Sequence, residues 1–301
     1  MSLNDFVPLI IKHIYVFLKI HLAMNVPIVT LTTDWGDRDH YVAMVKGRLY
    51  SSIPDVRVVD LSHSQDWDSV AVAAKIIQYG CLSFPAGTVH IIDFCEDLAI
   101  RNSAPKIYRP VPLLAEFNGQ YFLCCNRRLL EASLNADCDS IVNLPMPEIG
   151  SSDADTFLAY SLFCDVAAMI VRGAKLSDIG EPAAPIVHRS FLRAQFDGDI
   201  ISARPDVIDH YGNVTLNLKY SDFKEYCAGR KFRLELEFQV GAVEQFQYVT
   251  TVARHYGHEI QGNLVLTVSS TGYLQLAMNR GSAADLIGIN YSTVCRFVLG
   301  S

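Results

Sequence analysis

Three β-branched runs in the first hundred residues, each closed by an aspartate, constrain the fold most strongly. The run "VPIVTLTTD" ends at Asp34, "DVRVVD" at Asp60 and "TVHIID" at Asp93. None alternates strictly between apolar and polar residues, which is typical of parallel strands buried on both faces. Helical patterns over residues 41–52 and 69–79 separate the runs. The sequence therefore predicts an α/β fold with a doubly wound, mostly parallel sheet.

The pattern changes after residue 180. Upstream, "PLLAEFNGQYFLCCN" predicts a hairpin around Asn118-Gly119, and residues 154–173 predict a helix closed by glycine. Downstream, alternating strand patterns are separated by turns at regular intervals, which predicts a smaller antiparallel β domain of barrel-like form. We expect four segments: an N-terminal extension (1–24), an α/β domain (25–180), a linker rich in proline and alanine (181–187) and a β-rich C-terminal domain (188–301).

Composition narrows the class of protein. Half of the 301 residues are hydrophobic, 19% are charged, and the formal net charge is −7. A sequence-independent nucleic-acid binder needs a basic face, so no nucleic-acid partner is expected. The cysteines show no CxxC motif and no regular spacing, which favours reduced thiols in a cytoplasmic protein. The adjacent Cys124 and Cys125 are interpreted as packed core residues.

The first 24 residues are apolar but interrupted by charge. Lysines and histidines at positions 12, 13, 19 and 21 leave no uncharged run near the about 20 residues of a membrane span. The segment also lacks a basic start and a convincing cleavage site, so neither a membrane anchor nor a signal peptide is predicted. It is either a translated leader that precedes a natural start at Met24 or an added amphipathic helix that covers an apolar surface.

The aspartates that close the three runs are the first candidates for chemistry. In an open parallel sheet, ligands bind at the carboxyl ends of the strands, where Asp34, Asp60 and Asp93 are expected to gather. One such aspartate is usually a helix cap or a turn former, but clustered carboxylates repel unless a ligand or base offsets them. A carboxylate suits a ribose diol, a general base or a metal. Asp37 and Asp39 are expected to cap the helix that begins at Tyr41.

Several common chemistries find no support in the sequence. No GxGxxG, GxxxxGK[ST] or GxSxG motif is present. The pair His255 and His258 in "HYGH" has turn-like spacing, so no metal site and no cofactor are predicted. An acidic strand edge suits a nucleoside or a cationic ligand better than a phosphate.

Five motifs resemble one family. "TLTTDWGDRDHYVAMVKG", "IPDVRVVDLSHS", "FPAGTVHIID", "DHYGNVTLNL" and "SSTGYLQLAMNRGSA" occur in the order and spacing of the S-adenosylmethionine (SAM) hydroxide adenosyltransferases, which are relatives of the fluorinase and chlorinase. The resemblance extends from about Pro27 to the C-terminus. It implies a doubly wound N-terminal domain, a β-rich C-terminal domain and a homotrimer with its sites between subunits.

The resemblance also implies a reaction and a set of residues. Water or halide attacks the ribose 5′ carbon of SAM and expels methionine. The sulfonium leaves as a neutral thioether, so the difficult task is to present a desolvated, deprotonated nucleophile. The implied substrate-binding residues are Asp34 on the ribose hydroxyls with Trp35 beside it, Tyr211 and Asn213 on the adenine, and backbone around Ser270, Thr271 and Arg280.

The chain departs from the family at the chemical centre. After the third strand, "DFCEDLAIRN" keeps Asp93 but loses the family's glycines, and Arg101 matches the family's arginine only across an inserted residue. The family's catalytic histidine aligns with Leu158. Its Pro-Asp-Asn-Gly turn becomes "CNRR" at residues 125–128. The halide-binding serine of the halogenases aligns with Ala159, so halogenation is not expected.

Two functional interpretations follow, with a third behind them. In the first, the protein cleaves SAM to adenosine and methionine with Asp93 as base. Glu96, Asp97 or Arg101 then supplies what the family's histidine and arginine supply, and Arg101 is the chosen catalytic partner. In the second, the chain is a catalytically silent adenosine- or SAM-binding protein. The third keeps only the trimeric fold. Losing one partner of a cooperating set often removes most activity, so the first two remain open.

Three further residues have structural interpretations beside functional ones. His63 in "DLSHS" either caps a turn or contacts the ligand. His90 lies inside a strand and is interpreted as a core histidine with satisfied hydrogen bonds. Trp67 either stacks on a ligand or covers the apolar helix that follows, and we favour the second role.

Overall fold

The computed structural model describes residues 26–64, 70–94, 111–146, 157–188, 193–240 and 243–300. The contacts of the chain divide it into two compact units between residues 188 and 189, and each unit is described by itself. The predicted N-terminal extension, Trp67, Glu96, Asp97 and Arg101 lie outside the described residues.

The N-terminal unit is built on one seven-stranded sheet with the strand order β2-β1-β3-β5-β4-β6-β7. The first four strands in that order pair in parallel, and the last three pair antiparallel at one edge. This arrangement confirms the predicted mostly parallel sheet. The strands are β1 (Ile28–Thr33), β2 (Arg57–Ser62), β3 (Val89–Asp93), β4 (Leu113–Phe117), β5 (Gln120–Cys124), β6 (Ile141–Asn143) and β7 (Glu181–Pro182). The start of the predicted linker is therefore the edge strand β7.

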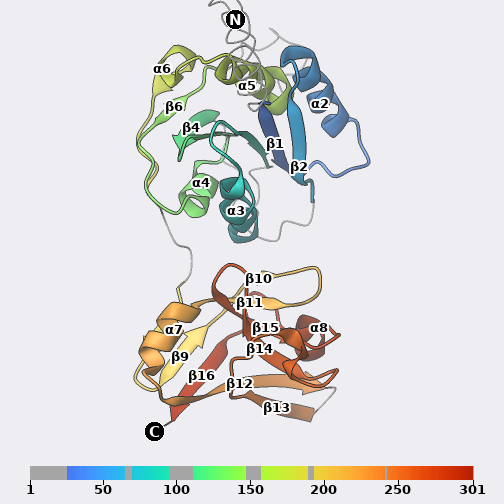
Figure 1. Cartoon of the computed structure of the whole chain (residues 1–301), viewed down its shortest axis with the longest axis vertical. Coiled ribbons are helices and arrows are strands. Elements are labelled where there is room, and N and C mark those ends of the chain that lie inside the picture. Colours follow the sequence, from blue (N-terminus) through green and yellow to red (C-terminus); the bar gives the residue numbers. More distant parts are fainter. Residues whose placement is uncertain are drawn as a thin grey trace, which may run out of the picture. The chain divides into compact units, whose positions relative to one another are not determined.

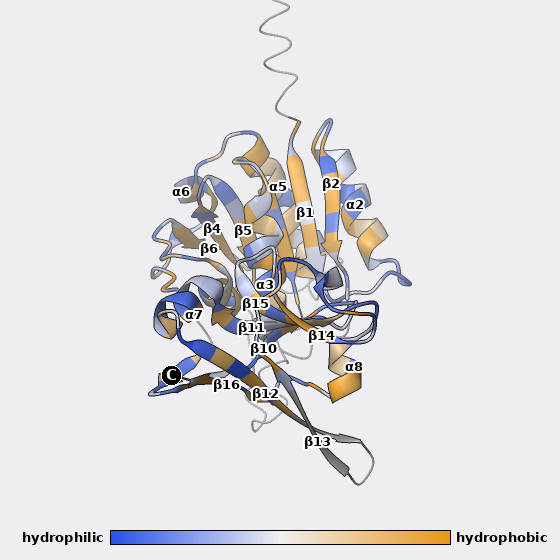
Figure 2. Ribbon diagram, turned by 60° about the horizontal axis from the view of Figure 1, so that its bottom comes forward, coloured by the Kyte–Doolittle hydropathy of each residue, from blue (hydrophilic) through white to orange (hydrophobic). Residues whose placement is uncertain are grey.

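Helices cover both faces of this sheet (Figure 1). The elements are α2 (Tyr41–Ser52), a π-helix (Ala159–Phe163) and α5 (Cys164–Val171) on one face, α3 (Val70–Tyr79) and α4 (Arg127–Ser133) on the other, and the short helices Cys81–Ser83 and α6 (Leu176–Ile179). Val29 and Leu31 of β1 are fully buried against the first face, and Thr30 and Thr32, which alternate with them along the strand, are fully buried as well. Burial on both sides explains why β1 carries no charged residue and has only threonines beside its aliphatic residues, so that the strand is orange to pale in Figure 2.

The observed bounds of α2 match the predicted helix, but its start differs from the expectation. His40 is the N-cap residue, and no side chain caps the helix. Asp37 and Asp39 were expected to cap it, and that prediction is wrong because His40, which follows both of them, occupies the cap position. The start of α4 follows the usual rule: Leu129 N donates to Asn126 Oδ1 at 3.0 Å.

The hairpin predicted at Asn118-Gly119 is confirmed. The two residues connect β4 to β5 with φ angles of 53° and 71°. Both positive angles belong to the tight two-residue turn that matches the twist of antiparallel strands, and Asn-Gly tolerates them best. The predicted helix over residues 154–173 is described from Phe157 onward, and Gly173, with φ of 88°, follows its end.

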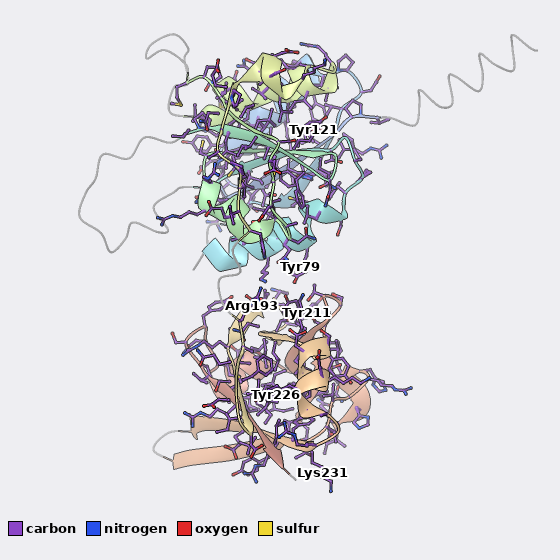
Figure 3. The ribbon with its side chains drawn as sticks, turned by 90° about the vertical axis from the view of Figure 1, so that its left-hand side faces the viewer. Tyr79, Tyr121, Arg193, Tyr211, Tyr226 and Lys231 are labelled. Carbon is purple, nitrogen blue, oxygen red and sulfur yellow. The ribbon has the colours of Figure 1, made fainter. Side chains whose placement is uncertain are left out.

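The C-terminal unit contains two antiparallel sheets that share one core, and its side chains fill the space between them (Figure 3). The strand orders are β10-β11-β15-β14 and β13-β12-β16-β9-β8. This confirms the predicted antiparallel domain. The elements are β8 (Gln195–Asp197), β9 (Ile200–Ala203), β10 (Pro205–Ile208), β11 (Val214–Lys219), α7 (Tyr220–Cys227), β12 (Lys231–Val240), β13 (Val243–Val249), a 3₁₀ helix (Tyr256–His258), β14 (Leu264–Val268), β15 (Tyr273–Met278), α8 (Ala283–Ile287) and β16 (Cys295–Gly300).

Two broader expectations can be compared with this fold. Cys124 is buried in the core, as predicted, while Cys125 is half-buried. Within the described ranges, every helix is too short or too polar to cross a lipid bilayer.

Candidate functional site

Two of the three strand-end aspartates meet at the carboxyl edge of the N-terminal sheet. β1 and β3 are neighbours, and Thr33 at the end of β1 pairs with Asp93 at the end of β3. Asp34 is the next residue of the chain, so the two carboxylates lie close enough for the charge of Asp34 to act on Asp93. This edge is where ligands bind in open α/β sheets.

Asp93 has an unusual ionisation. Burial raises its pKa to about 6, and the negative charge of Asp34 acts in the same direction. A hydrogen bond opposes this effect, because Trp35 Nε1 donates to Asp93 Oδ2 at 3.2 Å. A carboxylate with a pKa near neutrality both accepts and returns a proton readily, which is the property of a general base.

Trp35 is fixed between two other rings. It stacks on His63 with a centroid distance of 6.1 Å, and Phe157 meets it edge-on at 5.0 Å. Phe157 in turn packs edge-on against Tyr41 at 5.1 Å. These rings form an apolar wall beside Asp93. Sequence reasoning did not include Phe157, whose aromatic character just before the predicted helix was the only available signal.

Asp60 does not join the other two aspartates. It pairs with Leu31 rather than with the end of β1, because β2 continues two residues beyond it to Ser62. The expectation that all three carboxylates share one edge is therefore wrong for Asp60. Its carboxylate instead contacts Lys46 Nζ at 2.5 Å.

His63 connects Asp60 to the end of β1. His63 Nδ1 forms a 2.6 Å hydrogen bond with Thr33 Oγ1. His63 Nε2 lies 3.1 Å from Asp60 Oδ1, within ion-pair distance although its angle is outside hydrogen-bond geometry. Burial favours the neutral acid, but Lys46 and His63 outweigh it and lower the pKa of Asp60. His63 thus contacts both Thr33 and the ring of Trp35.

His90 lies in the core, as predicted. It is fully buried, and its ring nitrogens contact Thr30 Oγ1 at 2.7 Å and Gln120 Oε1 at 3.3 Å. Burial lowers its pKa to about 4, so the imidazole is neutral at physiological pH.

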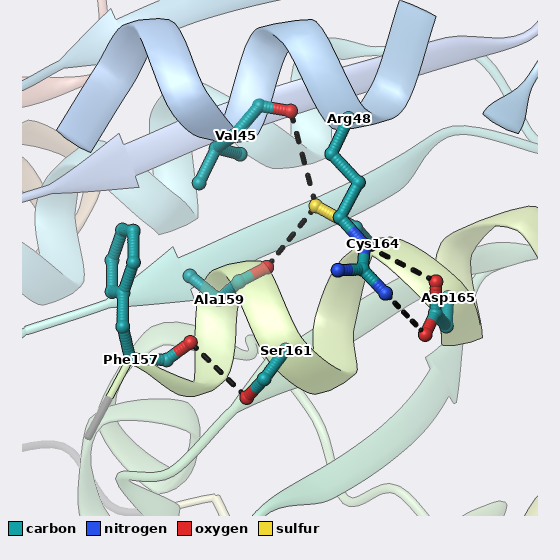
Figure 4. Close-up of polar contacts among 7 residues, drawn as sticks. All are labelled: Val45, Arg48, Phe157, Ala159, Ser161, Cys164 and Asp165. Atoms are coloured by element: carbon teal, nitrogen blue, oxygen red, sulfur yellow. Dashed lines mark hydrogen bonds and ion pairs between the residues drawn. The ribbon is translucent and has the colours of Figure 1, made fainter. Parts of the chain in front are cut away.

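A π-helical turn follows Phe157 directly, with Leu158 as its N-cap residue and Ala159 as its first residue. Cys164 Sγ donates to Ala159 O at 3.1 Å and approaches Val45 O at 3.9 Å, which ties this turn to α2 (Figure 4). Arg48 and Asp165 add a two-pronged ion pair between α2 and α5, with Nη2–Oδ2 at 2.7 Å. Turns of this kind are frequent at functional sites, where they change the direction of side chains.

The residue at the family's histidine position is apolar. Leu158 is buried and is the N-cap residue of the π-helical turn. A leucine side chain has no ionisable proton, so this position offers no acid–base chemistry. The segment at residues 125–128, where the family resemblance places a Pro-Asp-Asn-Gly turn, has structural roles. Asn126 caps α4, and Arg127 Nη2 donates to Ala184 O at 2.7 Å.

The C-terminal unit holds a well-braced loop around Asn213. Asp209 Oδ1 accepts hydrogen bonds from the backbone N–H groups of Tyr211 and Asn213, both at 2.9 Å. Asp209 Oδ2 accepts a third from Asn213 Nδ2 at 2.9 Å. Asn213 is thereby buried and oriented, with Oδ1 as its remaining acceptor, while Tyr211 is 73% exposed. Asp209 was not among the predicted residues, although an aspartate four residues before the asparagine is a recognisable turn signal.

Gly212 allows this loop to pack against α8. Its φ is 74°, and a β-carbon at this position would lie 1.9 Å from Ser282 Oγ. Ala284 N donates to Gly212 O at 3.0 Å, so the contact is fixed from both sides. Only glycine satisfies the angle and the space together.

The other predicted residues of this unit fall into two places. Arg280 is exposed at the end of β15, two residues before the Ser282 that contacts Gly212. Ser270 and Thr271 lie in the turn before β15, and Gly272 of that turn accepts a hydrogen bond from Tyr220 N. β15 separates these places by about 20 Å along the strand. The structure therefore groups Tyr211, Asn213 and Arg280 but leaves Ser270 and Thr271 apart.

No metal-binding site is found in the part of the chain that the structure describes. There, no three histidine, cysteine, aspartate or glutamate side chains are arranged to hold an ion.

Comparison with known proteins identifies related sequences over most of the chain. Residues 29–180 match the family model described as the SAM hydroxide adenosyltransferase N-terminal domain, and residues 206–296 match that of the C-terminal domain. A relative from Salinispora tropica, named (R)-S-adenosyl-L-methionine hydrolase, is 28% identical over 91% of this chain and 98% of its own. A fluorinase from Actinoplanes sp. is 24% identical over 86% of this chain and 93% of its own.

Solved structures share the fold. An uncharacterized conserved protein from Thermotoga maritima superposes with a TM-score of 0.68 at 21% identity, covering 90% of this chain and 99% of its own. A conserved hypothetical protein from Thermus thermophilus gives a TM-score of 0.56 at 20% identity, covering 91% of this chain and 100% of its own.

Proposed function

Because the chain belongs to the SAM hydroxide adenosyltransferase family, we propose that it cleaves SAM with water to adenosine and methionine, with Asp93 as the general base. The observation that carries this proposal is the pair of carboxylates at the sheet edge. Asp93 has a pKa of about 6 beside Asp34, and Trp35 donates a hydrogen bond to it. A relative named as a SAM hydrolase supports the same reaction.

The two carboxylates take different tasks in this proposal. Asp34 follows β1 and accepts hydrogen bonds from the ribose hydroxyls, for which a carboxylate has two suitable oxygens. Asp93 accepts a proton from water. The water oxygen forms a bond to the ribose 5′ carbon while the carbon–sulfur bond breaks. The electron pair of the breaking bond stays on sulfur. Methionine leaves as a neutral thioether, so the departure needs no acid.

The apolar surroundings assist the nucleophile. Trp35 and Phe157 form a wall beside Asp93, and Leu158 adds an aliphatic side chain to the same segment. Water bound in such a place loses part of its hydration, which strengthens its attraction to a base. In this chain the base is therefore a carboxylate, without the histidine that the family resemblance would place at position 158.

The C-terminal unit supplies the proposed nucleoside contacts. Tyr211 has an exposed ring on which an adenine can stack. Asn213 Oδ1 is available to accept from the exocyclic amino group because Asp209 holds its Nδ2. Arg280 is exposed in the turn that follows β15. The family resemblance favours a homotrimer with these sites between subunits, and we include that assembly in the proposal.

A second function remains a candidate on one observation. Leu158 carries no titratable group where the family resemblance expects histidine, which favours a silent protein that binds adenosine or SAM without cleaving it. The ribose-binding role of Asp34 is the same in both cases. Only turnover separates them.

A direct assay tests the proposal. The full-length protein is incubated with SAM, and adenosine and methionine are followed by chromatography, with calorimetric titration of adenosine in parallel. We expect equal amounts of both products and their loss in Asp93→Asn. An exposed acid of the same unit supplies the matched control, Asp37→Asn, which should keep the activity. Tight adenosine binding without products would overturn the enzymatic proposal in favour of the binding protein.

A further inference from the structure

Three arginines line a cavity in the C-terminal unit, and none of the residues that line it is assigned to the nucleoside. The cavity has a volume of about 230 Å³. Its lining residues are Arg193, Gln195, Ser202, Arg204, Asn217, Val294 and Arg296. The lining thus combines three permanent positive charges with hydrogen-bonding side chains and contains no carboxylate. The chain as a whole carries a net charge of −7, so this cavity is a basic site on an acidic protein.

Paired residues on the neighbouring strands β8, β9 and β16 form one side of the cavity. Ser202 on β9 pairs with Gln195 on β8 and with Arg296 on β16, which places the three side chains in one row on the outer face. Their sequence neighbours Ile201 and Phe297 are fully buried on the opposite face. The strand pairing therefore fixes the spacing of these three side chains, and the buried residues behind them anchor the strands.

Hydrogen bonds fix the other side of the cavity. Asn217 Oδ1 accepts from Arg204 N at 2.8 Å, so the amide of this buried side chain has its donor end left for the cavity. Arg204 Nη1 donates to Ser292 O at 2.7 Å, which orients its guanidinium. Donors that are oriented before a ligand arrives lose little freedom when they bind it.

The nearest acid on the same row is already engaged. Glu235 on β12 pairs with Arg296 across the sheet, but its Oε1 accepts from Arg233 Nη2 at 2.6 Å. Among the described acids, none forms an ion pair with Arg193, Arg204 or Arg296. The charge of the three guanidinium groups is thus available to a ligand.

We propose that this arginine-lined cavity binds a phosphoryl group, either as free phosphate or as a small phosphate monoester. Guanidinium groups form paired hydrogen bonds with phosphate oxygens, and amide and hydroxyl donors complete the shell. Three cations match a dianion better than a monovalent anion such as chloride. The cavity is smaller than the roughly 300–1,000 Å³ typical of drug-sized ligands, which limits the organic part to a few atoms.

Calorimetric titration of the full-length protein tests the site, with inorganic phosphate and glycerol phosphate as probes at constant ionic strength and without SAM. We expect saturable binding to the wild type. Arg296→Gln and Arg193→Gln should each weaken it about 10- to 100-fold, the range for one charge-assisted hydrogen-bonding partner. Tighter binding of glycerol phosphate than of phosphate would identify a monoester, and equal binding would identify the oxyanion alone.

A matched variant controls for the loss of one charge. Lys231 is exposed at the opposite end of the C-terminal unit from Arg193 (Figure 3), and Lys231→Gln should change the affinity less than about twofold. Arg193 lies outside the strands, so its variant tests the site even if Arg296→Gln folds poorly. Absence of saturable binding to the wild type, or equal weakening by Lys231→Gln, would overturn the proposal. Neither result bears on the cleavage of SAM, because that reaction uses other residues.

Discussion

Replacing Asp93 by asparagine should stabilise the protein at neutral pH while it removes the proposed base. In the folded state the Asp93 carboxylate is buried beside the negative charge of Asp34, and both effects raise its pKa from 3.8 to about 6. Asparagine has nearly the same shape and keeps an oxygen that can accept the hydrogen bond from Trp35. The variant therefore removes the charge and leaves the packing in place.

The sign and the size follow from the two pKa values. Folded Asp93 binds a proton more tightly than unfolded Asp93, so its contribution to stability is complete below about pH 3.8 and is lost as the pH rises through about 6. A difference of about 2 pKa units corresponds to about 3 kcal/mol. Because the residue keeps part of its surface exposed to solvent, we expect the loss to lie between about 1 and 3 kcal/mol.

Urea denaturation followed by tryptophan fluorescence measures this effect. Urea is preferred because it does not screen charges, and the free energy of unfolding is compared at about pH 4.5, 6 and 8. The difference in unfolding free energy between Asp93→Asn and wild type should grow by about 1–2 kcal/mol from the lowest pH to the highest, because part of the loss is already present at about pH 4.5. The exposed-acid variant Asp37→Asn should show no such growth.

Two results would refute the reasoning. A difference that stays constant from the lowest of these pH values to the highest would mean that Asp93 has an ordinary pKa in the folded protein. A variant that becomes less stable than wild type at high pH would mean that the ionised carboxylate stabilises the fold, as in a salt bridge. In either case Asp93 would lose its main qualification as a base that works near neutral pH.

Three further predictions use other parts of the chain. Asp34→Ala should weaken adenosine binding at least about tenfold in calorimetry, because the ribose loses its acceptor; unchanged affinity would disprove the assigned contact. Gly212→Ala should lower the free energy of unfolding by more than about 2 kcal/mol, since the new β-carbon meets Ser282. The control Gly229→Ala, at a position with φ of 84° and open space, should lower it by only about 1–2 kcal/mol. Equal losses in the two variants would contradict this account. Cys164, whose pKa burial raises to about 12, should resist Ellman's reagent at about pH 8 until the protein is unfolded, and rapid labelling of the native thiol would show that it is accessible.

Local sequence patterns were sufficient for most of the architecture. The β-branched runs predicted β1, β2 and β3. β1 and β3 have no polar side to display because they are buried on both faces, whereas β2, at the edge of the sheet, is only partly buried. The Asn-Gly pair predicted the β4–β5 hairpin, because few other residues accept two positive φ angles in succession. Such patterns depend only on residues that are close in the chain, so they can be read directly from the sequence.

The sequence-based predictions failed where the role of a residue depends on the residue at which a strand or helix begins or ends. Asp60 reads as the end of a strand, yet β2 continues to Ser62, and that extension separates its carboxylate from the site. Asp37 and Asp39 read as helix caps, yet His40 occupies that position. Element ends depend on tertiary contacts as well as on local preference, so the pattern determined the element but not its last residue.

The order of the elements, the two-part organisation and the family can therefore be inferred from local sequence patterns. The chemistry of particular groups depends on contacts that form only in the folded chain. The pKa of Asp93 depends on Trp35 and Asp34, which lie almost sixty residues away in the chain, and the basic cavity joins arginines from positions 193 to 296. Electrostatic energy depends on distances in space and on burial, and neither is written in the local pattern of a sequence.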